Sequence, residues 1–209
     1  GKLQEAQERC NEGIQYALGE WASLPALDVA SHTPLLQMFQ QFQELQESAQ
    51  MLMELNNSQR AGTVPDLSSI LTTWRERLPN EWEHLLAWND LVSWRNHMFT
   101  HISSVMSRAA EGTPALASLG YQELLWTVVR FAHVARRHAL PEACINIIAK
   151  LSSVSTGIAA VDLNDTFSKM REQVRSCLQM PGLVPHGMQM LSQTDIDQHS
   201  KPQQAELFQ

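Results

Sequence analysis

The sequence predicts an all-α fold, an α-solenoid of antiparallel helical hairpins. Apolar residues recur at steps of three and four through most of the 209 residues. No segment alternates apolar and polar residues with the period of two that marks a strand. The helices so indicated have similar lengths and are joined by short turns, which is typical of stacked tetratricopeptide-like repeats and not of a closed bundle.

Composition is that of a globular chain, with 44% hydrophobic and 18% charged residues. The charged fraction is low and glutamine is abundant, which suits a segment whose surface is partly covered by other protein. The net charge is −7 without a basic stripe, so we expect no direct binding of nucleic acid. There is no signal peptide and no apolar run near about 18 residues, so we expect neither secretion nor a membrane span.

The first hairpin is predicted from two amphipathic helices. Residues Lys2–Trp21 place apolar side chains at helical spacing, and Pro25 follows in a run that breaks the pattern. The second helix is expected to start at Thr33 and Pro34, because a hydroxyl cap followed by a proline in the first turn suits a helix start.

The clearest loop is expected at Asn56–Pro65, which is polar and contains glycine and proline. After it, Asp66 can cap a short helix that runs through Arg77. Pro79 is expected to force the end of that helix, since proline cannot continue it.

The stretch Leu71–Val105 holds four of the six tryptophans and is predicted to organise the chain. Asn80 is expected to cap a long helix within it. At about 100° per residue, one half of that helix is apolar and should be buried: Leu85, Trp88, Leu91, Val92, Met98, Phe99, Ile102 and Val105. The other half is polar: Asn89, Ser93, Asn96, His97, Thr100 and Ser104.

Arg95 projects from the apolar half of this helix, where an unpaired charge would be costly. We therefore predict a carboxylate partner, which is Glu81, Asp90 or a residue of another helix. The alternative is that Arg95 reaches solvent along its aliphatic stem. The residues expected to form the structural core of the stretch are Trp74, Trp82, Trp88, Trp94, Arg95 and Phe99.

The second half of the chain predicts a further hairpin and then shorter helices. A loop at Ala109–Gly120 precedes a helix over Tyr121–His138, and the Leu140-Pro141 turn starts the next helix. This hairpin is spaced roughly like one tetratricopeptide repeat of about 34 residues. Three more helices are expected: one carrying Phe167, Met170, Val174 and Cys177 and stopped by Pro181-Gly182, one at His186–Ser192, and one opened by Pro202.

No pattern of metal ligands stands out. His97 and His101 share a helix face at acceptable ligand spacing, but they lack the glutamate of an HExxH motif and read as two exposed histidines. His133 and His138 do not share a face. The three cysteines Cys10, Cys144 and Cys177 lie far apart in apolar contexts, which indicates reduced thiols buried in the core.

No pattern of catalytic residues stands out either. The sequence lacks a GxSxG turn, a glycine-rich phosphate loop and a cysteine with an orienting histidine. Glu81, Glu83 and Asp90 lie near tryptophans, but their expected work is capping and ion pairing. Tryptophans at helical spacing are interpreted as core and not as a ligand cage. We therefore predict that the chain is not an enzyme and has no catalytic residue, cofactor site or metal site.

Three blocks carry a resemblance to a known family. They read PLLQMFQQFQELQESAQ (Pro34–Gln50), LTTWRERLPNEWEHLLAWNDLVSWRNHMF (Leu71–Phe99) and AHVARRHALPEACINII (Ala132–Ile148). In order and spacing they resemble the FAT region of the transformation/transcription domain-associated protein (TRRAP) family, a branch of the phosphatidylinositol-3-kinase-related kinases. The resemblance covers nearly the whole chain, and its WRxRLPNxW core is characteristic of this branch. It carries over no functional residue, because that FAT region has no catalytic motif.

The resemblance implies that residues 1–209 are part of a FAT helical-repeat domain. The chain starts inside a helical pattern and stops at AELFQ, so we expect both ends to continue in a much larger polypeptide. The family implies a nuclear, non-catalytic scaffold of SAGA-type and MYST-type histone acetyltransferase complexes that supports a kinase-like domain lacking catalytic residues. The implied partners are the rest of its own chain, including that domain and other helical repeats, the complex subunits, and transcription activators.

Two other functions remain open from the sequence. The first is the FAT region of an active phosphatidylinositol-3-kinase-related protein kinase. The second and more distant one is an unrelated tetratricopeptide-like module that binds peptides. Such a module would need a groove lined with asparagine, lysine or arginine at regular repeat positions, and the sequence does not indicate one.

Overall fold

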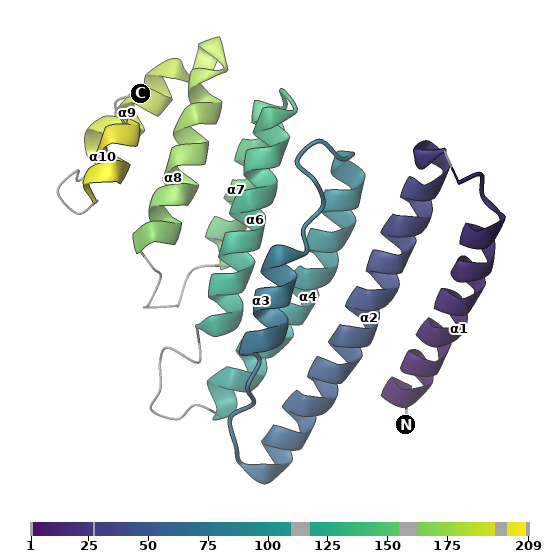
Figure 1. Ribbon diagram of the computed structural model, residues 1–209. Coiled ribbons are helices and arrows are strands. Elements are labelled where there is room, and N and C mark those ends of the chain that lie inside the picture. The colour runs from purple at the N-terminus through teal and green to yellow at the C-terminus, as the bar shows by residue number, and fades with distance from the viewer. Residues whose placement is uncertain (1, 27, 110–117, 155–162, 195–199, 208–209) are drawn as a thin grey trace. The chain divides into compact units, whose positions relative to one another are not determined.

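The computed structural model describes residues 2–26, 28–109, 118–154, 163–194 and 200–207. Within these residues it contains α-helices, one 3-10 helix and no strand, so the predicted all-α class is confirmed. The chain divides into two compact units, Gly1–Arg77 and Leu78–Gln209, which are described separately. Within the units, helices pack on near neighbours in the chain: α1 on α2 in the first unit, and α4 on α6 and α6 on α7 in the second (Figure 1).

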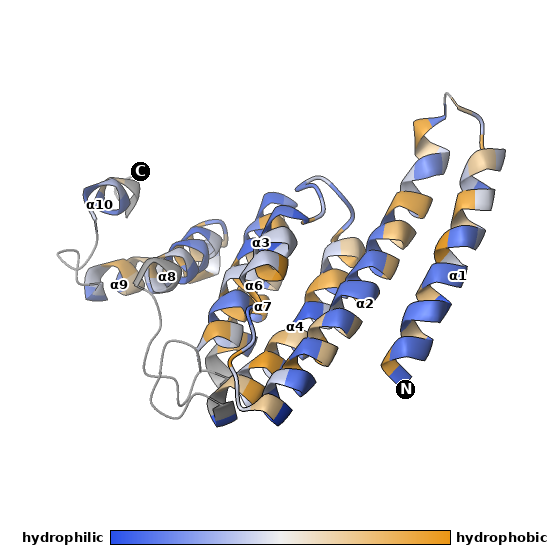
Figure 2. Cartoon of the chain, turned by 60° about the horizontal axis from the view of Figure 1, so that its bottom comes forward, coloured by the Kyte–Doolittle hydropathy of each residue, from blue (hydrophilic) through white to orange (hydrophobic). Residues whose placement is uncertain are grey.

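The first unit contains α1 (Lys2–Ser23), α2 (Val29–Ala61) and α3 (Ser68–Glu76). α1 and α2 lie side by side as a hairpin (Figure 1). α1 buries only Cys10 and Ala17. Most of its remaining surface is hydrophilic, as the blue segments of α1 in Figure 2 show. The predicted first helix is confirmed, and its contact with α2 is a narrow stripe.

α2 begins at Val29, four residues before the predicted start at Thr33, and Pro34 lies inside it. Pro34 lacks the backbone N–H that would otherwise bond the Ala30 carbonyl oxygen, and two side chains make contacts in the turn before it. The Thr33 hydroxyl donates to the Val29 carbonyl oxygen at 3.2 Å, and a His32 ring nitrogen lies 2.6 Å from the Asp28 carbonyl oxygen. Thr33 therefore lies within α2, where its hydroxyl bonds a carbonyl of the preceding turn, and it is not the N-cap residue.

α2 also runs further than expected, so the first six residues of the predicted Asn56–Pro65 loop are helical. The helix ends at Gly62, whose φ of +66° is left-handed and is adopted at no cost by glycine. α3 begins at Ser68 with Leu67 as its N-cap residue, so the predicted cap at Asp66 is one residue too early. Asp66 supports the start of α3 by accepting hydrogen bonds from the Ser68 backbone N–H at 3.0 Å and hydroxyl at 2.6 Å.

The second unit contains α4 (Leu85–Ala109), α6 (Leu119–Arg137), α7 (Pro141–Val154) and α8 (Leu163–Leu178). A 3-10 turn η1 (Pro181–Leu183), α9 (Val184–Gln193) and α10 (Lys201–Leu207) follow. α6 packs against α4, α7 and α8, and it holds the centre of this unit. The predicted hairpin of α6 and α7 is confirmed, with small buried residues near the turn: Ala132, Ala135 and Cys144. The predicted loop Ala109–Gly120 before α6 lies mostly outside the described residues.

The two faces of α4 are as the periodicity predicts. All the residues expected to be buried are buried, except that Leu85 is half-buried, and all the residues expected on the polar half are exposed. Arg95 is 1% exposed, so the alternative that it reaches solvent is wrong. Of the two carboxylates named as partners, Glu81 pairs with Arg130 and Asp90 is exposed, which favours a partner from another helix.

Trp82 is the exception among the residues assigned to the core, because it is 70% exposed. Trp74, Trp88 and Phe99 are buried, and Trp94 is half-buried. The error has a local cause. α4 begins at Leu85, so Trp82 precedes the helix and does not share its buried face.

Gly120, at the start of α6, is a point of close approach to α4. A β-carbon there would lie 2.4 Å from the Phe99 carbonyl oxygen and 2.9 Å from the Ser103 backbone nitrogen. Gly120→Ala is therefore expected to destabilise the second unit by about 1–3 kcal/mol, although alanine is the better helix former. Urea unfolding followed by circular dichroism measures this. Gly19→Ala is the control: apart from its own helix backbone, nothing lies within 4 Å of the added β-carbon, so the variant should not be destabilised.

Ala139 ends α6 with a left-handed φ of +61°. The Leu140 backbone N–H bonds the Ala135 carbonyl at 3.1 Å and the Ala139 N–H bonds the Arg136 carbonyl at 3.0 Å, the pattern of a Schellman cap. Since alanine is strained there, we expect Ala139→Gly to raise the free energy of unfolding by up to about 1 kcal/mol. Ala149→Gly, at an exposed interior position of α7, should lower it by about 1 kcal/mol. Thermal melts of the two variants measure both effects. If Ala139→Gly also destabilised the protein, Ala139 would not be strained in its left-handed conformation.

Candidate functional site

The structure offers little material for catalysis or metal binding. His97 and His101 are both exposed, and no group of three or more potential metal ligands occurs among the described residues. Burial raises the pKa of the thiols of Cys10, Cys144 and Cys177, which disfavours the nucleophilic thiolate. No helix in the described part of the chain is long and apolar enough to cross a membrane.

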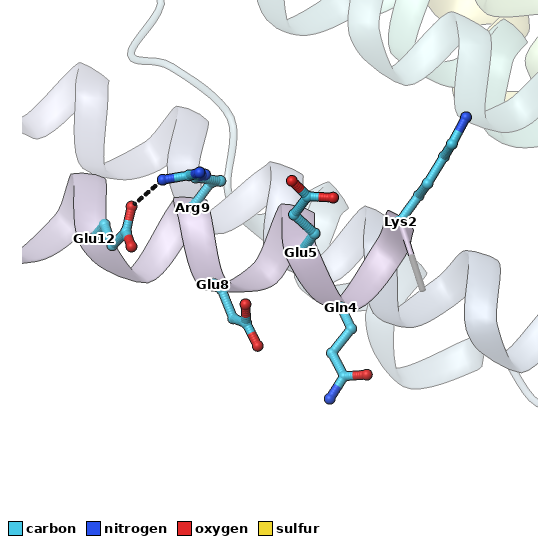
Figure 3. A pocket seen from close by; sticks show the side chains of 6 residues that line it. All are labelled: Lys2, Gln4, Glu5, Glu8, Arg9 and Glu12. Atoms are coloured by element: carbon cyan, nitrogen blue, oxygen red, sulfur yellow. Dashed lines mark hydrogen bonds and ion pairs between the residues drawn. The ribbon is translucent and has the colours of Figure 1, made fainter.

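One surface hollow follows α1, and Figure 3 shows its lining. The volume is about 610 Å³, and all six lining residues belong to this one helix: Lys2, Gln4, Glu5, Glu8, Arg9 and Glu12. Arg9 and Glu12 form an exposed ion pair at 2.9 Å, and Gln4 and Glu8 point away from it (Figure 3). Because all its lining residues belong to one helix, this hollow is the open surface of α1 and not an enclosed binding site. An exposed ion pair such as that of Arg9 and Glu12 contributes little stability.

A smaller hollow of about 220 Å³ lies among α4, α6 and α7. Val92, Leu124 and Phe131 help to form its apolar part, and Asn89, Asn96 and Lys150 are among its polar residues. Sequence reasoning missed this set, because its members are spread over three helices between residues 89 and 151. At this volume it has room for about one or two side chains, which is below the range usual for ligand sites.

A part-buried polar cluster joins α2 and α3 in the first unit. Glu47 accepts two hydrogen bonds from the Arg77 guanidinium, at 2.7 and 2.9 Å, and one from the Trp74 indole N–H at 2.8 Å. Burial opposes the charge on Glu47, but these bonds and that of Gln43 outweigh it and hold the pKa of the carboxyl below its ordinary value. The cluster fixes α3 on α2, and it leaves no carboxylate poised to exchange a proton near neutral pH.

A second buried cluster joins α6 and α8. The Glu172 carboxylate is fully buried; one oxygen lies 2.8 Å from Arg136 Nε and the other 3.1 Å from His133 Nδ1. Burial alone would raise the pKa of Glu172, but the hydrogen bonds and charges of His133 and Arg136 prevail and lower it from 4.5 to about 2. Sequence reasoning missed this cluster, since its members are separated by 36 residues and more.

The exposed Trp82 stands on a turn held by several hydrogen bonds. The Asn80 side-chain oxygen accepts from the Trp82 backbone N–H at 3.0 Å, and Glu83 accepts from the Asn80 N–H at 2.9 Å. Glu81 ties the turn to α6: its carboxylate meets Arg130 at 2.7 Å, and its carbonyl oxygen lies 2.8 Å from the Nε2 of the histidine that ends α6. The prediction that Asn80 caps the long helix is therefore wrong: α4 begins at Leu85, and Asn80 closes this turn instead.

Basic and aromatic groups meet at the end of α6. The Arg137 guanidinium lies over the Trp82 indole, 5.2 Å from the ring centroid, and the His138 and Trp82 rings are 6.5 Å apart. Beside them is a hollow of about 460 Å³ lined by Arg136, Arg137, Ala139, Pro141 and Gln179. In the second unit an exposed aromatic ring, the exposed Arg137 and a hollow coincide here, so this is the candidate interaction surface of the chain.

Two of the predicted core tryptophans, Trp74 and Trp88, are buried at separate helix contacts, one in each unit. The Trp88 ring stacks parallel to Phe131, with centroids 6.3 Å apart, and its indole N–H donates to the Asn80 carbonyl at 3.0 Å. Trp74 bonds Glu47 in the first unit. The indoles therefore serve separate helix contacts, and no cage of tryptophans around a ligand appears among the described residues.

Comparison with known proteins gives one family and several relatives. The family model of the FAT domain matches residues 1–209. The SAGA complex/NuA4 acetyltransferase complex subunit TRA1 of Saccharomyces cerevisiae is 34% identical over 98% of this chain, and its Schizosaccharomyces pombe namesake is 37% identical over 98%. The human transformation/transcription domain-associated protein is 29% identical over 92%. The chain spans only 5–6% of the length of these relatives.

Proposed function

The chain belongs to the FAT domain family, and we propose that it is a non-catalytic structural segment of a transcription cofactor in a histone acetyltransferase complex. The observation that carries the proposal is a match over the whole chain to relatives named as subunits of SAGA and NuA4 acetyltransferase complexes. Other relatives are named as transcription-associated proteins. This agrees with the resemblance of the sequence to the TRRAP family.

The physical basis of the proposed role is packing. Apolar faces such as that of α4 are buried between helices, and the part-buried Glu47 and the buried Glu172 are each paired with an arginine of their own unit. These ion pairs cross-link helices, and their carboxylates are engaged in structural contacts. A rigid stack of helices presents an extended surface, which is how solenoid proteins act as supports.

The finer features of the proposal concern the whole protein. We place residues 1–209 within a longer nuclear chain, where they support a kinase-like domain that lacks catalytic residues and contribute surface to complex subunits and activators. The 5–6% coverage of the relatives supports the idea of a longer chain. A FAT domain by itself is equally compatible with an active kinase of the related family, which is the alternative.

Purification of the epitope-tagged full-length protein tests the proposal. We expect acetyltransferase-complex subunits to co-purify in stoichiometric amounts, as mass spectrometry measures, and no phosphate transfer from ATP to protein substrates. Recovery of the protein without any acetyltransferase subunit would refute the assembly. Phosphotransfer that is abolished by mutating the kinase-like domain would establish the alternative.

A further inference from the structure

We propose that α8 and α9 form a releasable arm, which the Glu172 carboxylate holds on the hairpin of α6 and α7. The arm opens while α4 and α6 remain folded, so it is a conformational device within the second unit. Its opening changes the direction of the chain after α7. It depends on contacts between helices and not on a bound partner.

α9 is attached to α8 near both of its ends. Toward its start, a β-carbon at Gly187 would lie 3.0 Å from the Cys177 β-carbon, so the two helices approach closely there. At its end, the Thr194 hydroxyl lies 3.0 Å from the Met170 sulfur. The 3-10 turn η1 is the short connection between the two helices. Because these contacts lie along most of α9, we expect α8 and α9 to move as one body.

α8 buries few apolar side chains for a helix of its length. Among its described residues the buried apolar ones are Phe167, Val174 and Cys177. α4 buries many more: Trp88, Leu91, Val92, Met98, Phe99, Ile102, Val105 and Met106. Since apolar burial is the main favourable term in packing, separating α8 from its neighbours costs less than separating α4 from α6.

The attachment of α8 to α6 therefore depends on a polar contact. The Glu172 side chain is 0% exposed, and its oxygens lie 2.8 Å from Arg136 Nε and 3.1 Å from His133 Nδ1. From α8 itself, Arg171 Nε lies 3.4 Å from the oxygen that faces His133. Burial of a carboxylate is costly and its ion pairs offset that cost, so such a contact fails when one partner is removed. On opening, water solvates these charged groups, which lowers the cost of release.

One cysteine lies in the contact that the arm closes. Cys144 of α7 is 0% exposed, and its thiol lies 3.9 Å from the Glu172 carbonyl oxygen of α8. Release of the arm uncovers this thiol. Cys177 lies on the arm, where it faces Gly187 of α9, so it stays covered when the two helices leave together. Cys10 is buried in the first unit and does not report on the arm.

Alkylation of these native thiols in the purified full-length protein tests the arm. The probe is N-ethylmaleimide, added without denaturant, and mass spectrometry follows the labelling of each cysteine with time. We expect Cys144 to react before Cys10 and Cys177. Hydrogen exchange of the α4 amides in the same preparation measures the larger unfolding. The opening that exposes Cys144 should have a lower free energy than the opening that exposes those amides.

Removal of the carboxylate supplies the second arm of the test. Glu172→Gln should raise the labelling rate of Cys144 about a hundredfold, which corresponds to about 2.7 kcal/mol, and leave that of Cys10 unchanged. Glu142→Gln removes an exposed carboxylate from the helix that carries Cys144, and this matched control should change neither rate.

Three results would each overturn the proposal. Labelling of Cys144 no faster than its exposure by the unfolding of α4 would mean that α8 does not open separately. Equal labelling of Cys144 and Cys177 would mean that α8 and α9 do not leave as one body. A rate unaffected by Glu172→Gln would mean that the carboxylate does not hold the arm. The first two comparisons use the wild-type protein, so they decide the question even if Glu172→Gln fails to fold.

Discussion

Replacing Trp88 by alanine is expected to lower the free energy of unfolding of the second unit by about 3–5 kcal/mol, the range for large aromatic truncations in a core. The side chain is 0% exposed and stacks on Phe131 of α6. Its indole N–H also holds the Asn80 carbonyl, so the variant loses a hydrogen bond together with its packing. A cavity of this size between α4 and α6 cannot close without moving helices that pack on other neighbours.

Urea unfolding followed by circular dichroism measures the effect, and Trp82→Ala is the matched control. It removes the same side chain from a position that is 70% exposed, so its cost should stay below about 1 kcal/mol. Equal losses for the two variants would show that the assignment of Trp88 to the core and Trp82 to the surface is wrong.

Glu172→Gln is expected to cost about 3 kcal/mol. The change leaves Arg136 and His133 facing a neutral amide in a buried site, and removing one member of a buried ion pair is strongly destabilising. The pKa shift of Glu172 indicates the same magnitude, because a pKa of about 2 in place of 4.5 corresponds to about 3 kcal/mol. Glu142→Gln, an exposed carboxylate of α7, should change stability by less than about 0.5 kcal/mol.

The effect of Glu172 has a predictable dependence on pH. Its pKa is lowered on folding, so its contribution is fully present above the unfolded value of 4.5 and is lost as the pH falls toward 2. The difference in unfolding free energy between the wild-type chain and Glu172→Gln should therefore shrink between pH 4.5 and pH 2. Parallel urea titrations at pH 7, 4 and 3 measure it. A difference that stays constant over this range would mean that the carboxylate is not held by His133 and Arg136.

Periodicity predicted most of the fold because helix faces repeat locally. It located the buried and exposed sides of α4 and the hairpin of α6 and α7. Periodicity did not locate the helix ends correctly where local side-chain hydrogen bonds determine where a helix begins. Asn80 looked like the cap of α4, but its hydrogen bonds close a separate turn, and that shift exposes Trp82.

The partners of Glu47 and Glu172 could not be predicted from the sequence. Glu47 meets Arg77 across 30 residues, and Glu172 meets Arg136 across 36. Their pairing depends on which helix faces pack together, and a single sequence does not encode this in any local pattern. The same holds for the Trp82 surface, where the ring comes from one turn and the arginines from the end of another helix. The local signal available was the consecutive Arg136, Arg137 and His138 before a turn.

The most direct test of a purely supporting role is the acetyltransferase activity of complexes assembled with the Trp88→Ala full-length protein. Assembly is measured from subunit stoichiometry and activity per assembled complex from histone acetylation. If the helices only hold other parts in place, fewer complexes should form, and each complete one should acetylate at the wild-type rate. Normal assembly accompanied by a loss of activity in each complex would contradict the account, because the segment would then take part in the reaction itself.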